Sequence, residues 1–131
     1  MNSTVIMSIM AASILLTGCG NMDDDIVMRT KKEVAQSQVV GYASTKTISP
    51  TNIVFTLTEI WKGSDEASRS GYTNGTQFSD EYDSAGNPPE GAIIVFSTGA
   101  THQITTKDTI YVRSGRIVDM PVKEFRAKIG L

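Results

Sequence analysis

The segment Ile53–Trp61 constrains the fold of this chain more than any other, because its side chains follow a two-residue period. Two series of residues alternate along it: apolar Ile53, Phe55, Leu57 and Trp61 in one, and Val54, Thr56 and Thr58 in the other. Successive side chains of a strand point to opposite faces of a sheet, and β-branched and aromatic residues favour strands. The pattern therefore predicts a strand with one buried face and one partly exposed face, ending at Lys62-Gly63.

Further strands are predicted on both sides of this one: Gln38–Ala43, Thr76–Phe78, Ala92–Phe96, Thr109–Arg113 and Arg116–Asp119. Ala92–Phe96 is apolar throughout, which is typical of a central strand buried on both faces. The last two strands flank Ser114-Gly115, a two-residue hairpin signal. Gly41, within the first of these strands, predicts a bulge or a close approach of another backbone.

Turns and one long loop are expected between the strands. Ser49–Asn52 and Thr73–Thr76, which contains an Asn-Gly pair, have the composition of turns. The segment Ser79–Gly91 contains four acidic residues and two prolines, and we predict a disordered loop there. A cation site is the alternative, although Tyr82 and Ser84 stand where a calcium-binding loop needs acidic or amide ligands.

Two short helices are predicted, one before the strands and one after them. Ile26–Gln36 mixes apolar and charged residues at helical spacing. Pro121 suits the first position of a terminal helix, in which Val122, Phe125 and Ile129 form one apolar stripe. We expect this stripe to pack on the sheet, and a basic amphipathic helix lying on a membrane is the alternative. The whole pattern predicts a mainly β fold of five to six antiparallel strands with a short helix at either end.

The amino-terminal part has a different character, since Val5–Leu16 is an apolar segment of 12 residues without charge. It is shorter than the ~20 residues that cross a bilayer as a helix, and it suits the apolar region of a signal peptide. The run Leu15-Leu16-Thr17-Gly18-Cys19 then resembles a lipobox, the signal of bacterial lipoproteins. The resemblance implies cleavage before Cys19, an S-diacylglyceryl group on that residue and, in some bacteria, acylation of its freed amine. Two acyl chains give stable membrane anchoring.

Cys19 is the only cysteine, which excludes an intramolecular disulfide and a thiolate metal cluster. A buried thiol, a dimer-forming thiol and a nucleophile are the alternatives that its position disfavours. The predicted organisation is a signal peptide at residues 1–18, a polar tether at 19–25 and a single β-rich domain at 26–131. Mutual repulsion of Asp23, Asp24 and Asp25 is expected to keep the tether extended. The expected location is the extracytoplasmic side of a bacterial cell membrane.

The order of the predicted strands resembles the OB-type barrel of netrin-like and metalloproteinase-inhibitor-like domains in uncharacterised lipoproteins of Gram-positive bacteria. The resemblance depends on four segments: Val39-Val40-Gly41, Glu59–Gly63, Gly91–Phe96 and Gly115–Val118. It implies a small OB-like barrel over residues 34–131, with a plain antiparallel sandwich or roll as the alternative. Protease inhibition is not implied, because the animal inhibitors use a free amino-terminal cysteine and bracing disulfides.

The distribution of charge bears on the partners. The formal net charge of −2 argues against a nucleic-acid partner, which usually needs a basic surface. Basic residues nevertheless gather in residues 107–128, and acidic residues in residues 62–90. The basic part is suited to anionic lipid or a wall polymer, and two ordinary solvated surfaces are the simpler interpretation.

Candidate catalytic groups are few. His102 is the only histidine, and a small envelope hydrolase that uses it, with Ser97 nearby and Asp108 as orienting acid, is one hypothesis. Paired carboxylates such as Asp80 and Asp83 act in glycosidases only at a fixed separation around a cleft. Phosphate-binding glycine loops and zinc-ligand spacings are absent from the sequence, so no catalytic residue, cofactor or metal is predicted.

A non-enzymatic binding module at the cell envelope is therefore the preferred hypothesis. Tyr72 and Tyr82 fall in polar segments without an evident core to fill, and they are the candidate partner-contact residues. The expected partners are the membrane, through lipid on Cys19, and an envelope protein or wall polymer. An immunity or phage-exclusion lipoprotein is an alternative within the same class.

Overall fold

The computed structural model describes residues 22–83, 87–98 and 104–131. The first element of the described ranges is α2 (Met22–Gln36), and it leads into β1 (Val39–Ser49) and β2 (Asn52–Lys62). The following elements are α3 (Ser64–Arg69), β3 (Gln77–Glu81), β4 (Gly91–Thr98), β5 (Ile104–Val112), β6 (Arg116–Ile117), β7 (Met120–Pro121) and α4 (Val122–Lys128). None of the helices in the described ranges is long and apolar enough to cross a membrane.

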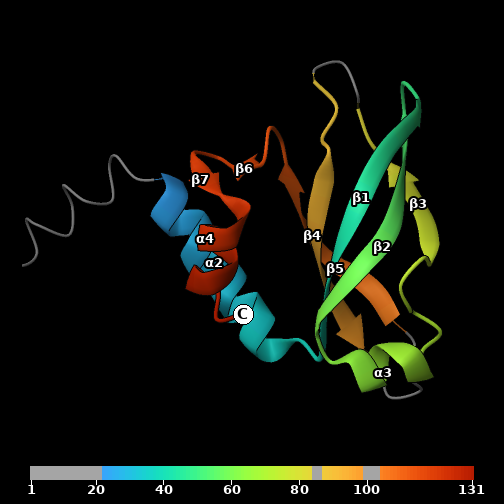
Figure 1. The fold of residues 1–131 in the computed structure, drawn as a ribbon, viewed down its shortest axis with the longest axis horizontal. Coiled ribbons are helices and arrows are strands. Elements are labelled where there is room, and N and C mark those ends of the chain that lie inside the picture. The colour runs from blue at the N-terminus through green and yellow to red at the C-terminus, as the bar shows by residue number, and fades with distance from the viewer. Residues whose placement is uncertain (1–21, 84–86, 99–103) are drawn as a thin grey trace, which may run out of the picture.

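The five long strands form one antiparallel sheet in the order β3-β2-β1-β4-β5, which curls into a half-barrel (Figure 1). β6 and β7 pair with each other in a small second sheet. Within the described ranges no ladder joins β3 to β5, so the barrel is open between them. The mainly β, barrel-like fold with a short helix at either end is confirmed.

Apolar side chains divide between two cores, one on each face of the sheet. The inner core draws on β1, β2, β4 and α3: Val39, Ala43, Ile53, Phe55, Leu57, Ala67, Ala92, Ile94 and Phe96. The outer core lies under α2, α4 and the small sheet: Val34, Val40, Ile93, Val95, Ile110, Val112, Ile117, Met120, Phe125 and Ile129. Adjacent residues of β4 therefore enter opposite cores, which confirms that Ala92–Phe96 is buried on both faces.

The terminal helix packs as predicted. Phe125 and Ile129 are buried in the outer core and Val122 lies against it, so this stripe is not free to face a membrane. Ser114 and Gly115 both have positive φ angles, of 55° and 70°, and the bridge between Arg113 and Arg116 closes the predicted two-residue hairpin. Gly41 lies at a register shift between β1 and β2, which confirms the expected bulge.

The prediction that Trp61 belongs to the buried series of Phe55 and Leu57 is wrong. Tyr42 pairs with Glu59 and Ala43 pairs with Leu57, so Thr58 is an extra residue that shifts the alternation of β2. Beyond this bulge Trp61 faces the outer core. Its ring stacks on Tyr42 with centroids 5.2 Å apart, and the Arg126 guanidinium lies 4.4 Å from its centroid.

Two predicted boundaries are also wrong. The acidic segment expected to be an extended tether begins a helix, because α2 starts at Met22. Carboxylates in the first turn of a helix are stabilised by its positive dipole end, which opposes their mutual repulsion. The expected loop Ser79–Gly91 begins with strand, since Ser79, Asp80 and Glu81 pair with β2.

The junction between α2 and the sheet depends on close backbone packing. Lys62 Nζ donates to the Val34 carbonyl oxygen over 2.7 Å, where a cation suits the end of a helix. The Ser37 hydroxyl lies within hydrogen-bond distance of the Val39 and Phe96 carbonyl oxygens and donates its single proton between them. Gly63 has φ 73°, and a Cβ atom there would lie 1.8 Å from the Gln38 carbonyl oxygen. Only glycine therefore fits beside the chain that leaves α2.

We expect Gly63→Ala to lower the free energy of unfolding by at least ~3 kcal/mol, because it adds a backbone clash to the ~1–2 kcal/mol cost of a left-handed residue. Urea denaturation followed by circular dichroism measures this. Gly75→Ala is the matched control, because Gly75 has φ 93° but open space around its Cβ position. Equal losses in the two variants would contradict the packing argument.

Candidate functional site

A cleft of about 380 Å³ opens between α2 and the β5–β6 end of the sheet. Its lining combines apolar and cationic residues: Ile26, Arg29, Thr109, Ile110, Tyr111, Arg113, Arg116, Ile117 and Val118. A hollow of about 310 Å³ between Asp25, Ile26, Arg29 and Val118 extends it toward the start of α2. We call the two together the arginine cleft.

The arginine cleft brings charges of both signs together: three arginines line it, Asp25 lies at its edge, and the Glu90 carboxylate accepts from the Gly115 N–H between Arg113 and Arg116. Arg113 Nε donates to the Asn87 carbonyl oxygen over 3.1 Å, and its Nη2 donates to the Tyr82 hydroxyl. Arg116 Nη2 donates to the Asp119 carbonyl oxygen over 2.6 Å. These acceptors are uncharged. Of the three cleft arginines, only Arg29 forms an ion pair with a residue of the described ranges.

Val118 is an unusual residue in the cleft wall. It begins the two-residue turn between Ile117 and Met120, has φ 55° and is 48% exposed. A β-branched residue rarely adopts a left-handed backbone, and such strain concentrates at functional sites. The turn thus presents an apolar side chain in the cleft at a cost to stability.

We expect Val118→Gly to raise the free energy of unfolding by about 1 kcal/mol, because glycine adopts a positive φ angle without strain. Thermal and urea denaturation measure this. Ser114→Gly is the control at the same φ angle of 55°, and it should gain less because serine is not β-branched. A loss of stability in Val118→Gly would contradict a strained turn.

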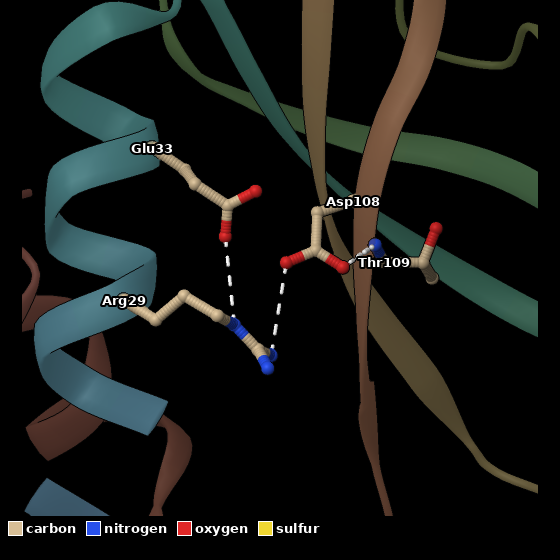
Figure 2. Close-up of polar contacts among 4 residues, drawn as sticks. All are labelled: Arg29, Glu33, Asp108 and Thr109. Carbon is tan, nitrogen blue, oxygen red and sulfur yellow. Dashed lines mark hydrogen bonds and ion pairs between the residues drawn. The ribbon is translucent and has the colours of Figure 1, made fainter. Parts of the chain in front are cut away.

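Behind the cleft, Arg29 joins α2 to the sheet through two carboxylates (Figure 2). Its Nε lies 3.7 Å from Glu33 Oε1, one turn along α2, and its Nη2 lies 3.7 Å from Asp108 Oδ2 on β5. Asp108 Oδ1 accepts from the Thr109 N–H over 2.9 Å. The guanidinium therefore lies between two acidic side chains that are each largely buried, with exposed fractions of 18% and 25%.

The environment raises the pKa of Glu33. Burial is the main cause, and the adjacent Asp108 carboxyl adds to it by sharing a hydrogen bond and by charge repulsion. Arg29 and Lys107 act in the opposite direction but do not cancel the effect. Glu33 is thus less stable as an anion in the folded protein than in the unfolded chain.

A pH-dependent loss of stability follows from this. A carboxyl whose folded pKa is raised binds more protons in the native state, so stability falls as pH rises from the ordinary carboxyl pKa through the folded value. We expect Glu33→Gln to be more stable than the native protein at pH 7, with the difference vanishing below pH ~4. Melting temperatures at pH 3.5 to 8 check this. Glu59→Gln, at an exposed strand position, is the control, and identical pH profiles for all three proteins would exclude the effect.

The structure gives both candidate contact residues a core to fill. Tyr72 packs edge to face against Phe78 and Phe96, with centroids 6.0 and 5.3 Å away, and Tyr82 packs against Tyr111 at 5.0 Å. The expectation that these rings lack a core is wrong, because aromatic side chains from loops and edge strands fill the open side of the half-barrel. A partner contact through their remaining exposed edges stays a prediction.

The other predicted site residues divide into two groups. Cys19 and His102 lie outside the described residues. Asp108 is placed, and it faces α2 through Arg29. In the described ranges no three residues of His, Cys, Asp or Glu gather as a metal site would require. The basic surplus in residues 107–128 includes Arg113 and Arg116, but no signal in the sequence connects them to Arg29, which reaches the same cleft from a distant helix.

Comparison with known proteins finds no relative for this chain. No family model matches it, and neither a curated protein nor a solved structure resembles it significantly.

Proposed function

We propose that this protein is a lipid-anchored, non-enzymatic binding module on the extracytoplasmic side of a bacterial cell membrane, and that the arginine cleft is its binding surface. One observation carries the proposal: the lipobox-like run ending at Cys19 stands directly before the helix whose first turns line the cleft. Anchor and binding surface then belong to the same end of the domain.

The chemistry of the cleft favours binding over catalysis. A guanidinium is always protonated in proteins, so it does not exchange protons as a general acid or base at neutral pH. It presents several N–H donors in a fork that matches carboxylates and phosphates. Arginines beside exposed apolar residues therefore suit an anionic ligand that has an apolar part.

Anchoring is tested by expressing the native chain beside Cys19→Ala in a bacterial host. We expect only the native form to sit in the membrane fraction and to gain a diacylglyceryl mass at Cys19, because the thiol is the acceptor of the lipid. Fractionation and intact-mass spectrometry measure both. Ser13→Ala, a substitution within the same apolar segment, is the control, because it leaves the Cys19 thiol in place. Equal membrane content and mass gain without Cys19 would overturn the proposal.

A further inference from the structure

We infer that the arginine cleft binds the phosphate of an anionic phospholipid headgroup in the leaflet that anchors Cys19, so that the domain lies with its α2–β6 end against the membrane. This inference rests on the proposed lipidation of Cys19. It assigns a ligand class to the cleft and an orientation to the domain.

The chain between Cys19 and the domain is short, and its length limits how far the domain can lie from the membrane. Cys19 and Met22 are three residues apart, so even a fully extended chain separates their Cα atoms by no more than ~10 Å. The polar layer of a bilayer is itself roughly 5–8 Å thick on each side. Whatever conformation the intervening residues adopt, the first turn of α2 stays at the membrane surface.

The fold places the rest of the arginine cleft near the amino-terminal end of α2. A helix rises 1.5 Å per residue, which puts Ile26 and Arg29 only ~6 and ~10 Å along the axis from Met22. Figure 1 shows β6 and β7 beside the amino-terminal end of α2. Val118, in the turn between them, lines the same hollow as Ile26 and Arg29. Arg113 and Arg116 reach the cleft from the adjoining hairpin.

The side chains suit a lipid phosphate better than a soluble anion. Arg113 and Arg116 are held by hydrogen bonds to uncharged oxygens, which fix their guanidinium groups without cancelling their charge. Val118 and Ile26 add apolar surface beside them, as the glycerol and upper acyl carbons of a lipid require. Asp25 stands at the rim, where the positive end of the α2 dipole offsets part of its charge.

The sole cysteine makes a direct test possible. In the lipidated protein the Cys19 thiol is blocked, so Val118→Cys introduces one reactive thiol at the cleft, and Ile48→Cys introduces one on an exposed strand near the β1–β2 turn. Each full-length, cell-processed variant is purified in detergent, labelled with an environment-sensitive fluorophore and reconstituted. The vesicles contain either phosphatidylcholine alone or phosphatidylcholine with phosphatidylglycerol at 7:3, with brominated acyl chains as quenchers in matched samples.

We expect quenching of the label at position 118, but not at position 48, to increase when phosphatidylglycerol is present. Removing both charges with Arg113→Gln and Arg116→Gln should lower the ratio of docked to undocked protein about fivefold per arginine, the equivalent of ~1 kcal/mol for each basic group at an anionic surface. Lys123→Gln with Lys128→Gln is the control of equal charge on α4, and it should leave the ratio near that of the native protein. Circular dichroism verifies that all variants are folded.

The possible outcomes distinguish failure of lipid binding by the cleft from failure of anchoring through Cys19. Two labels per molecule would show a free Cys19 thiol, and either that result or an absence of membrane association would overturn the proposed anchoring. One label per molecule with no effect of phosphatidylglycerol, or equal quenching at both positions, would overturn the inference and leave the anchoring intact. Inorganic phosphate that shifts the emission at position 118 as strongly as phosphatidylglycerol does would assign the cleft to phosphate in general and overturn a lipid ligand.

Discussion

Burial of β4 on both faces is the constraint on which the rest of the structure depends. Residues of this strand alternate between two cores, and all of Gly91–Phe96 is buried. A strand without a polar face must be shielded from water on both sides, and this domain shields its two faces in different ways. Curling of the sheet covers one face, and α2, α4 and the small sheet cover the other.

Covering the outer face places charged residues at the helix–sheet boundary, where some of them are partly desolvated. Arg29 offsets this by reaching both Glu33 and Asp108, yet the two carboxylates still disfavour each other. The joint between α2 and β5 is thus a compromise between packing and charge. The same arginine, 61% exposed, also faces the cleft. A residue that fastens the helix is in this way available to a ligand.

Much of this fold could be predicted from local patterns, because period-two alternation, a continuous apolar run and two-residue turn signals each report on nearby residues. The face that Trp61 occupies is not predictable from the sequence, because a bulge at Thr58 reverses the faces of β2 and composition gives no sign of such an extra residue. The packing of Tyr72 and Tyr82 is hidden from the sequence for a related reason. Their core is assembled from β3, β4 and β5, which are distant in sequence.

The candidate site was harder to predict than the fold, since its parts are separated by more than 80 residues along the chain. A basic surplus in residues 107–128 was visible, but its pairing with the start of α2 depends on how the helix crosses the sheet. The strain at Val118 was likewise invisible, because valine in a strand-rich segment predicts extended backbone. Its positive φ angle arises from the tight reversal between β6 and β7.

The attachment of α2 has a mechanical consequence. The helix is fastened to the sheet at its carboxyl end, through Lys62 on Val34 and Ser37 on Phe96, while the preceding chain enters at its opposite end. A force applied along the helix axis at that end would load the outer core in shear. Many side-chain contacts then resist together instead of separating one after another. The arrangement therefore resists a force applied along α2 from its amino-terminal end.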